Sequence, residues 1–265
     1  MTGQDLHYFR QWFAEYVKSF YTPDEGDNRN IEMKETHSLH VCENILRIAG
    51  EERLDENRAM MAETIGLFHD VGRFPQYAVY GTFRDSISVN HGEFGARVLA
   101  ENAVLSALPE RERHIIMTAV KFHNAFRVPD LQDNETEFFL KMIRDADKLD
   151  IWRIFFEYYG KPEDERPSAA GIGLPDIPGY SPEVLERIFN KQLIPLTMLR
   201  TLNDFKLTQL SWMYDLNFAV SFTIITAEDY INRIACTLPQ TEEIKRMVAF
   251  LHDYIKEKIK ETGNG

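Results

Sequence analysis

His69 and Asp70 are adjacent at the end of an apolar run with helical periodicity, and Gly72 follows them. His69 continues the helix face of Ala62 and Ile65, so its imidazole is expected to point inward. That is an unusual place for two side chains of the kind that bind metal ions. Taken in isolation, the pair has a second interpretation, which is a hydrogen-bonded core histidine beside an aspartate that caps a turn.

Three further histidines occupy similar positions. His37 lies on the inner face of a predicted helix, and His123 ends another apolar run. His91 opens a helix in which Gly92 and Gly95 permit the close approach of a neighbouring backbone. Each of these histidines alone is also explained as a core or cap residue.

Asp147 interrupts the apolar stripe of a long predicted helix, whose other members are Leu140, Ile143, Ile151 and Ile154. A buried, unpaired carboxylate costs several kcal/mol, so Asp147 must be protonated, paired with a cation or bound to a metal. The neighbouring Asp145 and Asp150 are predicted to be solvated or to have surface partners.

Together, six inward-facing side chains make up a nitrogen- and oxygen-rich donor set: His37, His69, Asp70, His91, His123 and Asp147. Four imidazoles and two carboxylates suit one or two divalent transition-metal ions, namely Mn, Fe, Co, Ni or Zn. The set contains too much nitrogen for Mg or Ca alone. The joint occurrence therefore favours a metal site over six unrelated core residues.

Helices must position these residues, because apolar residues recur at spacings of three and four and no long alternating pattern is present. An all-α fold is predicted, with helices at about residues 4–21, 30–50, 55–70, 91–107, 110–124, 135–159, 182–199, 203–236 and 241–261. Residues 72–90 and 160–182 are expected to be irregular. We expect a metal-binding core in residues 1–160 and a C-terminal helical extension, residues 161–265, that packs on it.

The 265 residues include 42 acidic and 30 basic side chains, for a net charge of −12. This balance argues against general nucleic-acid binding. Cys42 and Cys236 are far apart and no apolar signal segment leads the chain, which favours a reduced, cytoplasmic setting. The most apolar segment, residues 212–226, is too short to span a bilayer, so no membrane association is expected.

In its order, the donor set resembles the HD-domain metal-dependent phosphohydrolase superfamily. The motif of that superfamily is H, HD, D, extended to H, HD, H, H, D in its two-metal members. The resemblance covers about residues 30–155 and is most specific in Gly66-Leu-Phe-His-Asp-Val-Gly-Arg73 and Asp145-Ala-Asp-Lys-Leu149. It implies an all-α bundle.

The resemblance also implies a division of the ligands between two ions: His37, His69, Asp70 and Asp147 for the first, and His91 and His123 with a bridging Asp70 for the second. His40 shares part of the face of His37 and is an alternative ligand or an outer partner. The family pattern favours His37.

The activity that the resemblance implies is hydrolysis of a phosphoester, in a nucleotide or another small phosphorylated metabolite, by a metal-activated water. Asp70 and Arg73 are the candidate catalytic residues. Arg73 can present its guanidinium to phosphate oxygens bidentately, or it can form a surface salt bridge. The candidate substrate-binding residues are Arg73, Tyr80, Arg84, Asn124 and Lys148. Residues 77–90 either form a lid over the substrate or pack on their own scaffold.

Two positions depart from common family patterns. Arg73 stands where many members have lysine, and Asn124 stands where the cyclic-di-GMP phosphodiesterase branch has a second histidine. A Gly-Tyr-Pro motif is also absent. These departures argue against cyclic-di-GMP as the substrate.

Other functions fit parts of the pattern. The same ligand set resembles that of the mixed-valence di-iron oxygenases built on this fold, although hydrolases are the broader part of the superfamily. A regulatory module that had lost the reaction would lack some ligands, whereas all six positions here can bind metal. The C-terminal apolar helices are expected to close the bundle or to form a seam between copies in a homo-oligomer.

Overall fold

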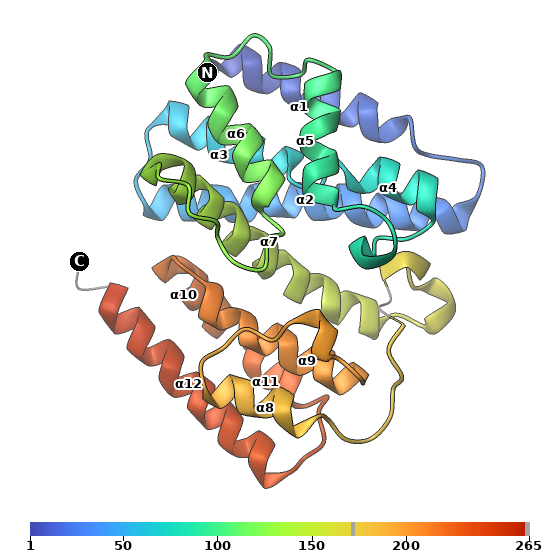
Figure 1. The fold of residues 1–265 in the computed structure, drawn as a ribbon, viewed down its shortest axis with the longest axis vertical. Helices are drawn as coiled ribbons and strands as arrows, with labels where there is room; N and C mark the ends of the chain where they lie inside the picture. Colours follow the sequence, from blue (N-terminus) through green and yellow to red (C-terminus); the bar gives the residue numbers. More distant parts are fainter. Residues whose placement is uncertain (171–172, 263–265) are drawn as a thin grey trace. The chain divides into compact units, whose positions relative to one another are not determined.

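The computed structural model of the chain describes residues 1–170 and 173–262. The chain divides into two compact units, Met1–Ile172 and Gly173–Gly265. Both are built from helices (Figure 1), and the described residues contain no β-strand. The all-α fold expected from the sequence is therefore confirmed.

The first unit contains the helices that carry the candidate metal ligands. Its α-helices within the described residues are α1 (Gly3–Lys18), α2 (Glu25–Glu51), α3 (Glu56–Phe68), α4 (Arg73–Tyr80), α5 (His91–Glu101), α6 (Glu110–Phe122) and α7 (Asn134–Gly160). Helix α2 packs along α3 and α7, while α6 packs against α3, α5 and α7. Short 3-10 turns are η1 (Asp85–Ile87), η2 (Glu163–Glu165) and η3 (Ser168–Ala170).

Helix α3 is central to this unit. Every residue from Met61 to Phe68 is buried, and burial continues through the His69–Asp70 pair that follows. This half of the helix is therefore buried on all sides and enclosed by its neighbours. At Gly66 a Cβ atom would lie 3.3 Å from the Cα atom of Cys42, so the glycine lets α2 and α3 approach closely.

Side-chain caps set where the helices around the site begin. Asp24 accepts a hydrogen bond from the backbone N–H of Asp27 at the start of α2, and Asn90 accepts one from Glu93 at the start of α5. Such caps satisfy N–H groups that have no partner inside the helix. The cap at Asn90 makes the next residue, His91, the first residue of α5.

Part of the stretch 72–90, expected to be irregular, is helical instead. Helix α4 occupies Arg73–Tyr80 and ends at Gly81, whose φ of 64° is left-handed. Pro75 lies in the first turn, where the missing N–H is not needed, and Gly81 tolerates the left-handed geometry that ends the helix. The remaining segment, residues 82–90, includes η1.

The second unit has shorter helices than the sequence predicts. Within its described residues they are α8 (Pro182–Phe189), α9 (Leu202–Ser211), α10 (Ala219–Ala227), α11 (Tyr230–Ala235) and α12 (Glu242–Thr262), with 3-10 turns η4 (Leu196–Met198) and η5 (Trp212–Asp215). Helix α12 packs on α8, α10 and α11.

Two predicted helices in this unit are wrong. The helix expected over residues 182–199 ends at Phe189. The predicted range also contains Pro195, and a proline in a helix interior would break the helix. The single helix expected over residues 203–236 is broken by the extended Leu216 and by Asp229, which has a φ of 52°. Aspartate tolerates this left-handed region better than most residues.

Residues 161–170, grouped above with the C-terminal extension, belong to the first unit. Buried Asn30 of α2 binds them, because its side-chain oxygen accepts from the N–H of Ala169 and its amide donates to Ser168 Oγ. Residues 171–172 and 263–265 of that extension lie outside the described residues. Packing of the extension on the core stays a prediction.

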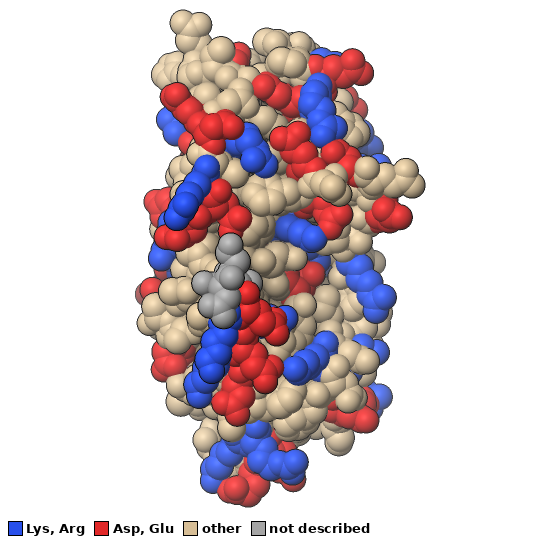
Figure 2. Space-filling model, turned by 90° about the vertical axis from the view of Figure 1, so that its left-hand side faces the viewer, with Lys and Arg blue, Asp and Glu red and all other residues tan. Residues whose placement is uncertain are grey.

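The described helices include none long and apolar enough to cross a membrane. On the face shown in Figure 2, Lys and Arg side chains are interspersed with Asp and Glu, and no continuous basic surface is visible there.

Candidate metal centre

The six predicted ligands come from helices whose ends or centres converge. His37 lies in the middle of α2 and Asp147 in the middle of α7. His69 ends α3, His91 begins α5 and His123 ends α6, so three of the four imidazoles stand at helix ends. Helices of one packed bundle thus deliver the imidazoles to one place.

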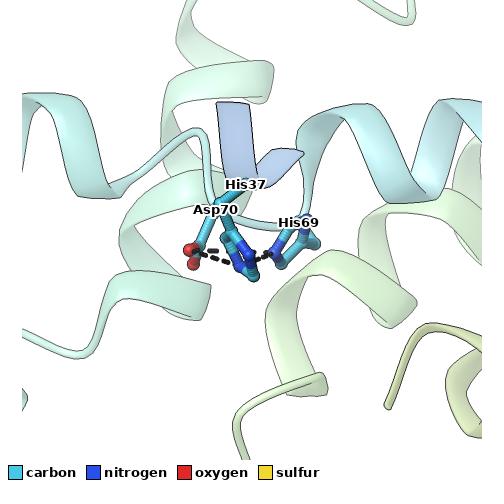
Figure 3. Close-up of side chains that lie close together, drawn as sticks. All are labelled: His37, His69 and Asp70. Atoms are coloured by element: carbon cyan, nitrogen blue, oxygen red, sulfur yellow. Dashed lines mark hydrogen bonds and ion pairs between the residues drawn. The ribbon is translucent and has the colours of Figure 1, made fainter. Parts of the chain in front are cut away.

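The first group combines α2, α3 and α7. His37 Nε2 lies 3.2 Å from His69 Nε2 and 3.2 Å from Asp147 Oδ1. Asp70 Oδ2 is 3.5 Å from the same nitrogen of His37 and 3.7 Å from that of His69. Figure 3 shows His37, His69 and Asp70 pointing toward one another. The donor atoms of these three residues are close enough to bind one ion, and Asp147 Oδ1 lies beside them.

The second group combines α5, α6 and the same aspartate. His91 Nε2 lies 3.0 Å from His123 Nε2. Asp70 Oδ1 is 3.3 Å from His91 Nε2 and 3.6 Å from His123 Nε2. One carboxylate therefore presents Oδ2 to the first histidine pair and Oδ1 to the second.

Hydrogen bonds on the far side of each ring turn the Nε2 atoms inward. His69 Nδ1 donates to the carbonyl of Gly66 and His123 Nδ1 donates to the carbonyl of Val120. Because a carbonyl oxygen can only accept, the proton must be on Nδ1, which leaves Nε2 with a lone pair. His37 and His91 direct Nδ1 to carboxylates of Asp150 and Asp85, respectively.

This donor set fits divalent transition-metal ions. Two donors that bind one ion at about 2.1 Å each lie about 3.0 Å apart in an octahedral and about 3.4 Å apart in a tetrahedral arrangement. The Nε2–Nε2 separations of 3.2 Å and 3.0 Å match these values. Two lone pairs that face each other at such a distance repel, unless a proton or a cation lies between them.

Burial keeps two of the imidazoles, those of His69 and His91, neutral. It lowers the pKa of His69 to about 4, and burial together with the charge of Arg73 lowers the pKa of His91 to about 3. Burial and Lys34 would also lower the pKa of His37, but hydrogen bonds with Asp147 and Asp150 outweigh them and raise it. Neutral imidazole is the form that binds metal.

The acidic members remain ionised despite their burial. Burial by itself would raise the pKa of Asp70, yet Lys34, His69 and Arg73 hold it well below its ordinary value. The pKa of Asp147 is lowered in the same way, chiefly by His37 and His69. Both carboxylates are therefore available as ligands at neutral pH.

The interpretation of Asp145 and Asp150 as solvated is wrong. Asp145 is fully buried, and Asp150 is 1% exposed. Asp150 Oδ2 lies 2.6 Å from His37 Nδ1, and both its oxygens accept from Arg153. Asp150 is one turn beyond Asp147, so it meets the other nitrogen of the ring whose Nε2 Asp147 contacts. His40, in contrast, is half-buried and its Nδ1 lies 3.1 Å from a carboxylate oxygen of Glu43.

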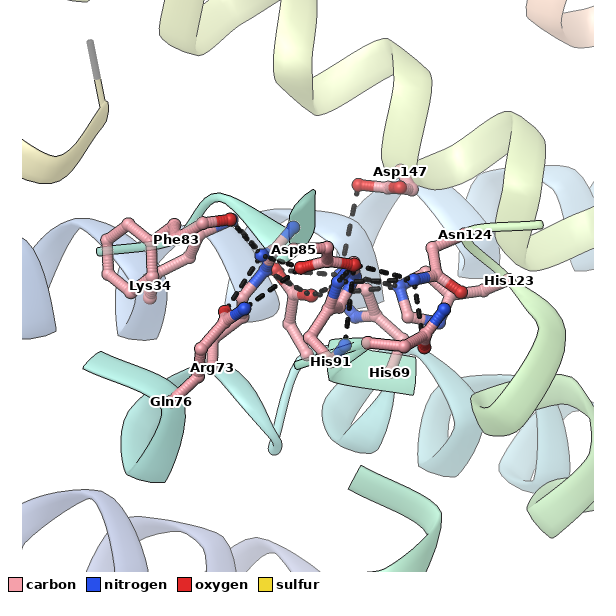
Figure 4. Close-up of polar contacts among 12 residues, drawn as sticks. Lys34, His69, Arg73, Gln76, Phe83, Asp85, His91, His123, Asn124 and Asp147 are labelled. Atoms are coloured by element: carbon pink, nitrogen blue, oxygen red, sulfur yellow. Dashed lines mark hydrogen bonds and ion pairs between the residues drawn. The ribbon is translucent and has the colours of Figure 1, made fainter. Parts of the chain in front are cut away.

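Two cationic side chains lie beside Asp70. Lys34 Nζ donates to Asp70 Oδ2 at 2.8 Å. Arg73 Nε lies 3.4 Å from Asp70 Oδ1 and, among the described residues, makes no hydrogen bond. Arg73 Nη1 donates to Gln76, to the carbonyl of Phe83 and to Asp85 (Figure 4). Arg73 thus forms ion pairs within the fold and also keeps one buried N–H directed at the site.

The other substrate-binding candidates lie at different distances from the cluster. Asn124 Nδ2 donates to Asp85 Oδ2 at 3.1 Å and lies 3.2 Å from His91 Nδ1. Lys148 Nζ donates to the carbonyl of Arg144 in its own helix. Tyr80 and Arg84 are exposed. Their proposed role as substrate contacts stays a prediction.

Sequence reasoning missed three residues that touch the cluster: Lys34, Asp85 and Asp150. Lys34 is three residues before His37, a spacing that places both on one face of α2 and could have identified it. Asp150 is three residues after Asp147, and this spacing could have identified it in the same way. No sequence spacing could have identified Asp85, because it lies in the segment between α4 and α5, whose course depends on tertiary contacts.

The fold and the site define an all-α domain with a buried, histidine-rich cluster of candidate metal ligands. The family model of the HD domain matches residues 35–152, a span that holds all six candidate ligands. Residues 35–152 are therefore identified as an HD domain, and the resemblance noted in the sequence is confirmed over that span.

Among solved structures, the chain is similar to the crystal structure of a predicted HD superfamily hydrolase from an uncultured Thermotogales bacterium. The two share 22% sequence identity over 60% of this chain and 82% of that chain, with a TM-score of 0.38. No curated protein matches the chain.

Proposed function

We propose that this protein is a metal-dependent phosphohydrolase that cleaves a phosphoester of a nucleotide or another small phosphorylated metabolite. The observation that carries the proposal is the pair of cations next to Asp70, with Lys34 at Oδ2 and Arg73 at Oδ1. A phosphoryl group brings negative charge to the site, and an ammonium and a guanidinium are suited to bind it.

We assign one ion to His37, His69, Asp70 and Asp147, and a second to His91, His123 and Asp70. A divalent ion bound by such ligands supplies Lewis acidity, lowers the pKa of water and neutralises charge on phosphoryl oxygens. The HD-domain match and the donor distances support this assignment.

The residues of the chain bind and orient the phosphate. Phe83 lies against both cations, with its ring centre 5.6 Å from Lys34 Nζ and 6.0 Å from Arg73 Cζ. This contact restricts both side chains before a substrate arrives, so less conformational entropy is lost on binding. The Nε–H of Arg73 makes no hydrogen bond among the described residues, so it can donate to a phosphate oxygen at the edge of the cluster.

A reconstitution screen tests the proposal. Metal-free protein is loaded separately with manganese, iron, cobalt and nickel under anaerobic conditions, and phosphate release is measured from nucleotides, sugar phosphates and cyclic dinucleotides. We expect hydrolysis of at least one class of phosphoester, dependent on the ion. His69→Ala is the control, because activity that survives in it belongs to a contaminant or to another site.

The same samples discriminate against the alternative, a mixed-valence di-iron oxygenase. Four imidazoles and two carboxylates also suit iron. After admission of air, oxygen consumption by the iron-loaded protein with no phosphate release from any ester would overturn the hydrolase proposal.

A further inference from the structure

The two histidine pairs are supported from different parts of the fold. His37 is supported by Asp150, which is 1% exposed and lies within α7. His91 is supported by Asp85, whose carboxylate lies 2.7 Å from Nδ1 of the ring. The Asp85 side chain is 31% exposed and belongs to the segment 82–90 between α4 and α5. The two supports therefore differ in burial and in the element that carries them.

Five donors converge on the Asp85 carboxylate (Figure 4). Its Oδ2 accepts from Asn124 Nδ2 at 3.1 Å and from the backbone N–H of His91 at 3.4 Å, besides the Nδ1–H of that ring. Its Oδ1 accepts from Arg73 Nη1 and Gln76 Nε2, each at 2.9 Å. Only a carboxylate can accept at both ends, since an amide would turn its NH2 group toward other donors.

The same network closes the segment 82–90 onto α4. Buried Gln76 donates to Ser88 Oγ at 2.8 Å and to the carbonyl of Val89 at 2.9 Å. Arg73 reaches the carbonyl of Phe83 from the same helix. The position of Asp85, and through it the orientation of the His91 ring, depends on this segment staying closed.

We propose that Asp85 is the positioning residue of the second ion alone, and that this ion binds more weakly than the first and is lost independently of it. A carboxylate that accepts Nδ1–H fixes the ring and makes Nε2 a stronger donor. Water and loop opening compete with a half-buried support more than with Asp150 inside a helix. The inference rests on the two-ion site of the proposed function.

Titration of metal-free protein with Mn²⁺, with free ion followed by electron paramagnetic resonance, tests the inference. We expect two steps in the wild-type protein, of which the weaker disappears in His123→Ala and the tighter in His69→Ala. Asp85→Asn should weaken the second step by about 10- to 100-fold and leave the first within about twofold. Asp150→Asn should do the reverse. A purely structural role for Asp85 would weaken both steps together.

Asp130→Asn, an exposed aspartate in the loop before α7, is the matched control, and circular dichroism establishes that each variant is folded. Equal weakening of both steps in Asp85→Asn, or of neither, would overturn the inference and leave the proposed function intact. A single ion in the wild-type protein also overturns it. If the wild-type protein binds no ion, both the inference and the proposed function fail.

Discussion

Asp70 links the two histidine pairs into one site. Each of its oxygens faces a different pair, and each is also contacted by a different cation, Lys34 or Arg73. Asp147, in contrast, makes its ion-pair contacts among the described residues with His37 and His69. Removal of the Asp70 carboxylate should therefore affect both ions, whereas removal of the Asp147 carboxylate should affect one.

Replacing Asp70 by asparagine should abolish binding of both ions, because the amide offers one oxygen and no charge to a site that uses two. Asp147→Asn should weaken only the ion bound by His37 and His69. Ion content after desalting, measured by plasma mass spectrometry, gives about two ions per chain in the wild-type protein, none in the first variant and one in the second. Retention of both ions in Asp70→Asn would contradict the bridging role.

Lys34 should contribute to phosphate binding. A hydrogen bond to a charged group contributes about 1.5–3 kcal/mol, so Lys34→Ala should lower kcat/KM by about 10- to 100-fold for whichever phosphoester proves to be the substrate. Lys34→Arg, which keeps the charge, should recover part of the loss. Lys18→Ala, at the exposed end of α1, is the control. Steady-state kinetics equal to wild type in Lys34→Ala would remove Lys34 from the site.

The direction of single side chains could be predicted where a helix fixed it. His37, His69 and His123 point inward because each continues an apolar face, and the structure buries all three. The prediction for Asp150 is wrong because it leaves out the three-residue spacing from Asp147, which places both carboxylates near the same ring. Asp85 was out of reach, since no periodicity applies within a loop.

The elements of the first unit meet at the site through small residues. At Gly72 a Cβ atom would lie 2.3 Å from the carbonyl oxygen of His91 and 2.5 Å from the nitrogen of Gly95. At Gly92 it would lie 2.6 Å from the carbonyl oxygen of Lys121. The close approach that the sequence predicts at Gly92 is confirmed, and these glycines let α5 approach both α6 and the turn after Asp70.

Gly72→Ala should destabilise the first unit, because backbone atoms would have to move and overpacking costs about 1–3 kcal/mol or more. Gly50→Ala is the matched control, since nothing lies within 4 Å of its Cβ position in α2. That change should be neutral or stabilising by up to about 1 kcal/mol. Urea unfolding measures both, and equal stability of the two variants would show that the contact at Gly72 is not tight.

Helices could be predicted best where apolar residues recur at helical spacing without interruption. The predicted ranges of the helices now seen as α2, α3, α6 and α7 differ from the structure by a few residues at their ends. The second unit was predicted less well, because the breaks on either side of α10 depend on the backbone conformation of Leu216 and Asp229. Apolar composition alone does not reveal where a chain turns.

Across the first unit, the buried cluster ties the stability of the fold to pH. The pKa values of His69 and His91 lie at about 4 and about 3, below the ordinary value of about 6.5 that they take when unfolded. Between these values the unfolded chain binds protons that the folded chain does not. Folding must then become less favourable as the pH falls.

We predict that the free energy of unfolding of the metal-free protein decreases as the pH is lowered from about 6.5 to 4, by up to about 1.4 kcal/mol per pH unit for each of the two histidines. His37 adds no slope there, because its raised pKa keeps it protonated in both states; its stabilisation is lost at higher pH instead. The lowered pKa of Asp70 and of Asp150 matters only below about 4, where the unfolded carboxyls take up protons.

Urea unfolding in the presence of a chelator, at half-unit steps of pH, measures this slope. His91→Gln removes one of the two titrating groups, so its slope should be about half that of the wild-type protein. A saturating divalent ion should raise stability at neutral pH and steepen the loss on acidification, because protons compete with the ion for the same nitrogen atoms. An unchanged slope in His91→Gln would mean that His91 is not held neutral inside the fold.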